Sequence, residues 1–286
     1  MIAAAFAVVS SLLLFAASPP DRFADLNGSK VHYTVEGDGP VAIIQIHGWT
    51  CNATFWRLQT PAFAKEYRVI SVDLPGHGQS DAPAGVDYTI EYFAEGVNAV
   101  IKHAGVDHAI LIGHSMGVPV SMKVLQDNPA VIQGLVAVDG PIWKFRRTGT
   151  PPWLKEMQRD YRTVAGNFIE SMFVNGTPLF LRAEIKRKML LTAPHVGLSS
   201  LLVMGSSDVY LKGPAKIPVL AVMATRRAKV DDRKRQHQEV FPILQYELWG
   251  EAGHFLMMEQ PERFNKLVLG FLHSVPGLHM SANITH

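Results

Sequence analysis

The sequence predicts an α/β fold, in which a mostly parallel sheet is covered by helices on both faces and carries an inserted helical lid. Short, nearly all-apolar runs alternate with segments of helical apolar spacing, which is typical of a parallel sheet buried on both faces. The alternation stops between residues 141 and 214, where helical spacing alone is found. The 286 residues are 48% hydrophobic and 18% charged, which suffices for one large core.

The chain begins with an apolar leader, residues 1–18, which ends in small residues. It resembles a secretory signal peptide with cleavage near Ala17 or Ser18. Its apolar run of about 16 residues is shorter than the ~20 that a membrane span needs. We therefore expect a secreted or periplasmic protein without a stable membrane span. Anchoring to a membrane by an uncleaved leader is the alternative.

Six apolar runs, each followed by a turn, are predicted strands: Val41–Ile46, Arg68–Val72, Ala109–Ile112, Leu135–Val138, Pro218–Met223 and Gln245–Trp249. Before the first of them, Asn27-Gly28 predicts a hairpin turn, because both residues tolerate positive φ. Apolar residues at helical spacing predict a helix that ends at Gly105 and a final helix that begins near Pro261. The core is thus expected to comprise residues 22–140 and 215–278.

The segment 141–214 is expected to form the lid. Its apolar residues follow helical spacing from Tyr161 to Met172 and again from Ile185 to Leu191. Prolines at 151, 152 and 178 interrupt the segment, so we expect several short helices rather than one long helix.

Composition excludes several classes of protein. A formal net charge of +2 supplies no basic field of the kind that nucleic-acid binding needs. Cys51 is the single cysteine of the chain, so neither an intrachain disulfide nor a cysteine-rich metal site can form. We expect no metal and no cofactor.

Gly113-His114-Ser115-Met116-Gly117 follows a predicted strand directly and precedes a helical run. This is the strand-turn-helix setting in which a G-x-S-x-G motif presents a nucleophilic serine. The turn forces the serine into a strained conformation, and the flanking glycines avoid collisions with neighbouring backbone. Ser115 is therefore the predicted nucleophile. A neighbouring imidazole must accept its proton, because a serine hydroxyl is a weak nucleophile at neutral pH.

Five motifs together resemble the α/β-hydrolase superfamily over about residues 22 to 275: HGWT, DLPGHGQSD, GHSMG, VDG and GHFLMMEQPERF. The resemblance implies the fold, a Ser-His mechanism and a structural role for the turn from Asp73 to Ser80. Its chain order of Ser, acid and His implies that His254 is the base. The oxyanion donors it implies are the backbone N–H groups of Trp49 and Met116.

The sequence indicates less directly which acidic residue orients His254. In many relatives it stands shortly after the seventh strand, but here that strand runs into Ala-Thr-Arg-Arg-Ala, residues 224–228, which contains no carboxylate. Two alternatives remain, Asp139 at the end of the sixth strand and the pair Asp231/Asp232. We favour Asp139, because the carboxyl ends of the strands are where such sheets place their sites. Asp231 and Asp232 instead look like residues at the solvent-exposed start of a helix.

A serine at position 115 argues against the haloalkane dehalogenases and epoxide hydrolases of this fold, which the resemblance implies would carry an aspartate there. We expect an enzyme that cleaves a carboxylic ester, lactone or thioester of a small to medium apolar substrate through an acyl-enzyme intermediate. Trp143, Phe255, Trp49, Met116 and lid methionines are expected to line the cleft. The competing hypothesis is a ligand-binding protein that has kept the fold but catalyses weakly or not at all. The sequence does not predict an oligomeric state.

Overall fold

The computed structural model describes residues 19–142, 149–203, 214–225 and 230–275, with residues 203 and 230–233 described by their backbone alone. Within these ranges eight strands form one sheet in the order β1-β2-β4-β3-β5-β6-β7-β8. The strands are β1 (Arg22–Leu26), β2 (Ser29–Glu36), β3 (Ala42–Ile46), β4 (Arg68–Val72), β5 (Ala109–His114), β6 (Ile132–Val138), β7 (Val219–Ala224) and β8 (Leu244–Trp249). The pairs from β4-β3 to β7-β8 are parallel, whereas β1 and β2 pair antiparallel. The predicted mostly parallel sheet is confirmed.

The six predicted strands correspond to β3–β8 with small differences at their ends. The largest difference is in β6, which begins at Ile132 rather than at Leu135. The predicted hairpin turn joins β1 to β2, and both of its residues have positive φ, 52° at Asn27 and 89° at Gly28.

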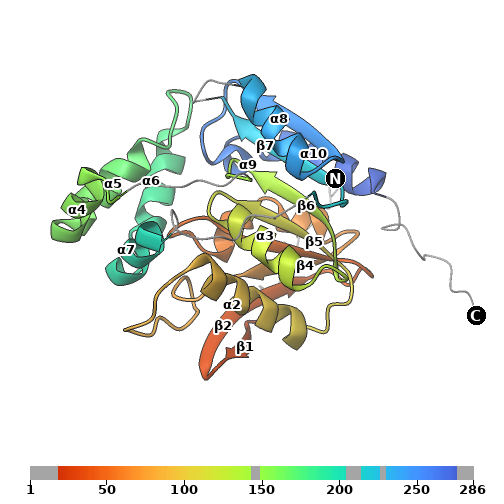
Figure 1. Ribbon diagram of the computed structural model, residues 1–286, viewed down its shortest axis with the longest axis horizontal. Coiled ribbons are helices and arrows are strands. Elements are labelled where there is room, and N and C mark those ends of the chain that lie inside the picture. The colour runs from red at the N-terminus through yellow and green to blue at the C-terminus, as the bar shows by residue number, and fades with distance from the viewer. Residues whose placement is uncertain (1–18, 143–148, 204–213, 226–229, 276–286) are drawn as a thin grey trace, which may run out of the picture.

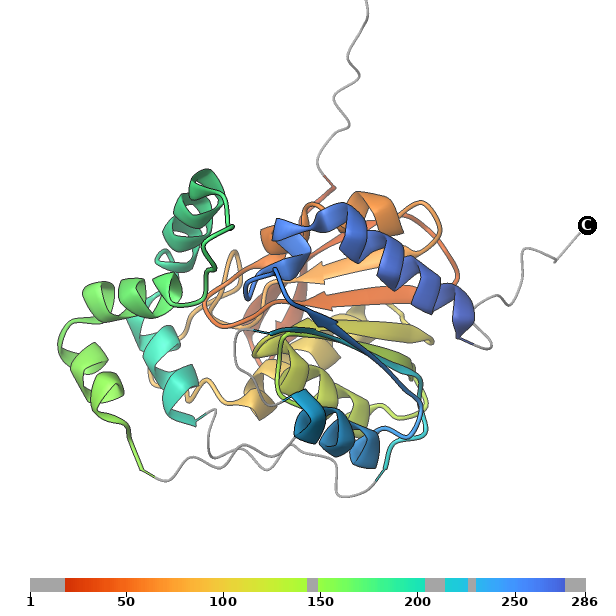
Figure 2. The same ribbon diagram turned by 90° about the horizontal axis from the view of Figure 1, so that it is seen from above.

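Helices cover both faces of the sheet (Figure 2). On one face lie α2 (Ile90–His103), α3 (Gly117–Asp127) and α8 (Val230–Val240). On the other lie the 3-10 helix η1 (Ala53–Trp56), α1 (Thr60–Phe63), α9 (Leu256–Glu259) and α10 (Pro261–Ser274). The predicted helices before Gly105 and after Pro261 are α2 and α10.

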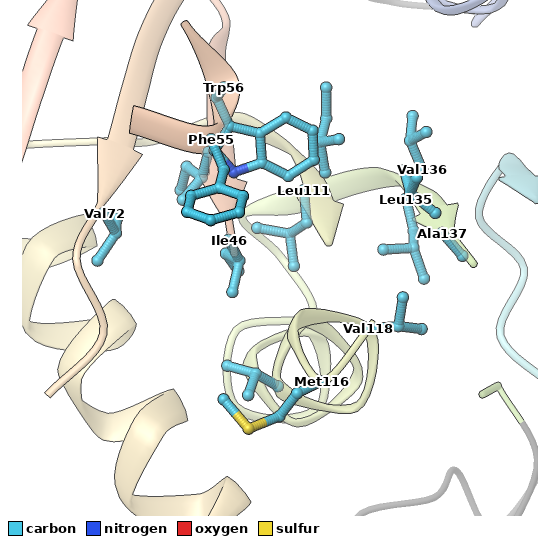
Figure 3. Close-up of a cluster of buried hydrophobic side chains, with 14 of the residues drawn as sticks. Ile46, Phe55, Trp56, Val72, Leu111, Met116, Val118, Leu135, Val136 and Ala137 are labelled. Carbon is cyan, nitrogen blue, oxygen red and sulfur yellow. The ribbon is translucent and has the colours of Figure 1, made fainter. Parts of the chain in front are cut away.

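The core lies between the sheet and its helices. Figure 3 shows part of it, in which Phe55 and Trp56 of η1 cluster with strand residues such as Ile46 and Leu111 and with Val118 of α3. Each of these side chains is fully buried. Every residue of β3 and β5 is buried, as the two central strands of a sheet covered on both faces require, and Ser115 directly follows β5.

Between β6 and β7 the described chain forms four short helices, α4 (Pro152–Arg159), α5 (Tyr161–Glu170), α6 (Leu179–Met189) and α7 (Pro194–Val203). We call this group, α4 to α7, the helical insertion; it lies to one side of the sheet (Figure 1). Pro151 and Pro178 are the N-cap residues of α4 and α6, so the prolines separate helices as expected. The leader, residues 1–18, lies outside the described residues, and within the described ranges no helix is long and apolar enough to cross a membrane.

The turn from Asp73 to Ser80 is held by the Asp73 carboxylate. Its oxygens accept hydrogen bonds from His32 Nδ1 at 2.8 Å and from the backbone N–H groups of Ala53 at 2.6 Å and Gln79 at 2.9 Å. Burial opposes ionisation, but these hydrogen bonds outweigh it and lower the pKa of the Asp73 carboxyl. The carboxylate therefore ties β2, η1 and the turn together.

Two buried histidines lie close to this turn, with ring centres 5.0 Å apart. His47 Nε2 accepts a hydrogen bond from the backbone N–H of Leu74 at 3.0 Å, and its Nδ1 donates to the carbonyl of Gly48 at 2.8 Å, so the ring is neutral. Burial lowers the pKa of His47, and burial next to His47 lowers the pKa of His77 to about 3.

These histidines predict acid lability. The unfolded chain binds protons at His77 below about pH 6.5 but the folded chain does not, so stability falls as the pH drops from about 6.5 toward 3. Each such group adds a slope of about 1.4 kcal/mol per pH unit to the free energy of unfolding. The amide of His77→Asn can still donate to the carbonyl of Pro75. When the free energy of unfolding in urea is measured between pH 5 and 6.5, its dependence on pH should be weaker in this variant by about that amount. Equal slopes in the parent and the variant would contradict a neutral His77.

Candidate active site

Ser115 occupies a sharp turn between β5 and α3. Its φ is 54°, in the left-handed region that a residue with a side chain rarely adopts. A Cβ at Gly113 would lie 2.5 Å from the carbonyl oxygen of Gly117, and one at Gly117 would lie 2.3 Å from that of Ile46. Both glycines are therefore required for the turn to pack against β3 and α3. The turn leaves the side chain of Ser115 half-buried.

His254 lies in the loop between β8 and α9, and Asp139 follows β6. His254 Nδ1 donates a hydrogen bond to Asp139 Oδ2 at 2.6 Å. The other carboxylate oxygen, Oδ1, accepts from the backbone N–H of Ala224 at 3.0 Å. The proton on Nδ1 leaves Nε2 as the basic nitrogen of the ring. The predicted contact between Asp139 and His254 is thus present.

The backbone around His254 is fixed by the helical insertion and by α9. The N–H of His254 donates to the carbonyl of Met172 at 3.1 Å. Glu259 accepts a hydrogen bond from the N–H of Gly253 at 2.6 Å and another from Thr177 Oγ1 at 3.2 Å. Two hydrogen-bonded links therefore join the histidine loop to the segment between α5 and α6.

His114 lies beneath this loop, with its ring centre 4.6 Å from that of His254. Its Nε2 donates to the backbone carbonyl of His254 at 2.8 Å. Burial, with the nearby His254, lowers the pKa of His114 to about 3. His114 is therefore a neutral hydrogen-bond donor that supports the loop.

The backbone N–H groups of Trp49 and Met116 form no hydrogen bond within the described part of the chain. Unpaired N–H groups beside a nucleophile are what an oxyanion needs. The side chain of Trp49 reaches into the helical insertion: its Nε1 donates to the carbonyl of Gly197 in α7 at 2.9 Å, and its ring contacts Phe168 of α5.

Ser115 and His254 line one small cavity of about 10 Å³. Its other lining residues are mostly apolar: Gly48, Trp49, Cys51, His114, Met172, Met189 and Phe255. No direct hydrogen bond joins Ser115 to His254, as is common in sites without a bound substrate. A cavity of this volume holds at most a single water molecule. Met172 and Met189 are the residues of the helical insertion that line this cavity.

The remaining predicted site residues have different outcomes. Phe255 and Trp49 line the cavity, whereas the side chain of Met116 is buried in the core (Figure 3) and does not. The prediction that Met116 lines the cleft is thus wrong for its side chain, because Met116 begins the turn into α3 and packs inward. Trp143 and the side chains of Asp231 and Asp232 lie outside the described residues.

Sequence reasoning missed Glu259 and Thr177, which hold the histidine loop. Glu259 stands within GHFLMMEQPERF, five residues after His254, and a carboxylate at that distance could have indicated a partner for the loop. Met172 and Met189 were expected only as unspecified lid methionines.

Comparison with known proteins gives a family and several relatives. The sequence profile of the alpha/beta hydrolase fold family matches residues 41–200. An uncharacterised protein of Mycobacterium tuberculosis is 33% identical over 122 residues, which are 43% of this chain and 35% of that protein. A soluble epoxide hydrolase of Corynebacterium sp. is 32% identical over 116 residues, 41% of this chain and 40% of that enzyme. The chain therefore spans well under half the length of these curated relatives.

Solved structures match over most of the chain. Est816, described as an N-acyl homoserine lactone degrading enzyme, is 25% identical with a TM-score of 0.76, over 87% of this chain and all of that one. An esterase from Exiguobacterium antarcticum is 21% identical with a TM-score of 0.79, over 88% of this chain and 99% of that one. At that identity the esterase shows a common fold alone.

The positive φ of Ser115 predicts a test of backbone strain. Glycine adopts this conformation without the ~1–2 kcal/mol that a side chain costs, but it adds entropy to the unfolded chain. We expect Ser115→Gly to exceed Ser115→Ala in free energy of unfolding by about 0.5–1 kcal/mol. Urea unfolding of both variants measures the difference. A Ser115→Ala protein more stable than Ser115→Gly would show that this turn is unstrained.

Proposed function

This chain belongs to the alpha/beta hydrolase fold family, and we propose that it is a serine hydrolase that cleaves carboxylic esters, lactones or thioesters of small to medium apolar substrates. The observation that carries the proposal is the hydrogen bond from His254 Nδ1 to Asp139 Oδ2 at 2.6 Å, in which His254 lines the same cavity as Ser115. An imidazole oriented in this way beside a strained serine is suited to nucleophilic catalysis.

In the proposed reaction Ser115 Oγ attacks the carbonyl carbon while His254 Nε2 accepts its proton. The N–H groups of Trp49 and Met116 stabilise the oxyanion, and each donor contributes on the order of 10²–10³ in turnover. When the tetrahedral intermediate collapses, His254 returns the proton to the departing alcohol or thiol. A water molecule, activated by the same imidazole, then hydrolyses the acyl-enzyme. Asp139 fixes the tautomer and stabilises the imidazolium without becoming protonated.

The helical insertion acts as a lid in this proposal. The cavity of about 10 Å³ cannot hold a substrate, so Met172 and Met189 have to move before one enters. The apolar lining supports a substrate with an apolar acyl group or a lactone ring. Est816, described as degrading an N-acyl homoserine lactone, supports the inclusion of lactones.

Epoxide hydrolases occur among the relatives, but the residue at the nucleophile position favours ester chemistry. The resemblance to the superfamily implies an aspartate at this position in the epoxide hydrolases, whereas this chain has Ser115. Water can hydrolyse an acyl-serine by attacking its carbonyl carbon. Attack of a serine on an epoxide would instead form an alkyl ether, which has no carbonyl carbon for water to attack.

Labelling by a fluorophosphonate tests the proposal, because such reagents react with an activated serine. The parent protein should be labelled at Ser115, while Ser115→Ala should remain unlabelled and lose hydrolysis of p-nitrophenyl esters. Ser115→Ala should keep its fold, as circular dichroism can verify. An unlabelled parent protein that is folded and binds apolar esters would instead indicate the non-catalytic ligand-binding protein.

The acid is tested by three matched substitutions. We expect Asp139→Asn to lower kcat roughly 10²–10⁴-fold, because the amide no longer holds the imidazole in the required tautomer. Asp231→Asn and Asp232→Asn should change kcat less than twofold. The assignment fails if Asp139→Asn keeps a near-parental kcat while one of the other two variants loses it.

A further inference from the structure

Helix α6 carries apolar side chains on two opposite faces. Leu181, Ile185 and Met189 recur every four residues and are buried, and Met189 lines the cavity of Ser115. The outward face comprises Phe180, Ala183, Arg187 and Leu191, which follow one another at helical spacing and are all exposed. Leu179 extends this face at the start of the helix. We call Leu179, Phe180, Ala183, Arg187 and Leu191 the outer α6 face.

The outer α6 face holds the three most exposed large apolar side chains of the described residues. Leu179 is 80% exposed, Phe180 74% and Leu191 71%, while the next, Ile243, is 53% exposed and lies before β8. Scattered apolar residues are common on protein surfaces, but three highly exposed ones on one helix face and its end are typical of an interaction surface.

Charge is distributed unevenly between the insertion and the rest of the chain. Residues 141–214 contain eleven lysines and arginines against five aspartates and glutamates, although the whole chain has a net charge of only +2. The remainder of the chain is therefore acidic. On the described part of the insertion, Lys155, Arg159, Arg162 and Arg187 are exposed and form no ion pair with a described residue. Arg187 lies between Ala183 and Leu191 on the outer α6 face.

The start of the described chain lies at the same side of the molecule. Pro19 lines a surface pocket together with Lys188, in the last turn of α6, and Leu191, two residues after the end of this helix. The apolar leader, residues 1–18, is joined to Pro19. The leader is therefore attached to the described chain at a residue that shares a pocket with the end of the outer α6 face.

We propose that the outer α6 face docks on an anionic lipid bilayer. Apolar side chains around a cation match the boundary between acyl chains and anionic headgroups. A second copy of the chain fits less well, because a symmetric contact would bring two strongly positive insertions together. Figure 2 shows the insertion standing to one side of the sheet, which leaves it accessible to a flat surface. Docking goes beyond the proposed function and does not depend on Ser115.

Docking has a consequence for catalysis that rests on the proposed function. The helix that contacts the bilayer on one face carries Met189 on the other, and Met189 lines the cavity of Ser115. A shift of α6 at the membrane would open the cavity toward substrates dissolved there.

The test is to place an environment-sensitive fluorophore at chosen positions of the full chain. Cys51 does not interfere, because it is 1% exposed and burial raises the pKa of its thiol. Phe180→Cys and Leu191→Cys report on the outer α6 face, and Ile243→Cys is the matched control. On vesicles of phosphatidylcholine with 30% phosphatidylglycerol (about one anionic lipid in three), the dye should shift to the blue at 180 and 191 but not at 243.

Three further variants measure the contribution of each part of the face by vesicle sedimentation. Phe180→Ser and Leu191→Ser should each lower the partition coefficient roughly tenfold. Arg187→Glu should lower it on anionic vesicles by roughly fivefold for each unit of charge removed, with a much smaller effect on pure phosphatidylcholine.

Several outcomes would overturn the proposal. Sedimentation without a dye shift at 180 and 191 would show that the leader or another face binds the bilayer. A dye shift that appears without vesicles and follows protein concentration would identify a second copy as the occupant. Fluorophosphonate labelling without vesicles reports on Ser115 separately, so failure of docking and failure of the proposed function can be told apart.

Discussion

The hydrogen bond between His254 Nδ1 and Asp139 Oδ2 joins residues that are 115 positions apart in the chain. It can form only if three neighbouring strands keep their register. Asp139 follows β6, its N–H donates to the carbonyl of Val222 in β7, and its Oδ1 accepts from the N–H of Ala224 at the end of β7. β8 pairs with β7 and leads to His254. A slip of one residue would turn Asp139 to the opposite face of the sheet.

The sequence could predict the features that local physics specifies. A strand buried on both faces must be apolar, so β3 to β7 were recognisable as short apolar runs, whereas β8, at the edge of the sheet, fully buries only Trp249. A turn as tight as that at Ser115 requires glycines on either side, so the proposed nucleophile stood out as well. Asp139 was reached by a weaker argument, the absence of a carboxylate after β7 together with its own position at a strand end.

The remainder depends on tertiary packing that no local pattern encodes. Helix α6 is apolar on two faces, so its sequence did not indicate which face would turn toward Ser115. Glu259 and Thr177 meet only because the histidine loop folds against the insertion, and their contact spans 82 residues. Met116 shows the opposite case. Its N–H has no hydrogen-bond partner among the described residues, while its side chain is buried in the core, and a prediction made for the residue as a whole could not separate the two.

The hydrogen bond from Trp49 Nε1 to the carbonyl of Gly197 links the helical insertion to the proposed oxyanion site through a single residue. Under the proposed function the same residue offers its backbone N–H to the oxyanion, so a rearrangement of α7 that broke this bond would release the side chain of an oxyanion donor. The position of the insertion and the reactivity of Ser115 would then be coupled, and a substitution in α7 could alter kcat although no side chain of α7 lines the described cavity.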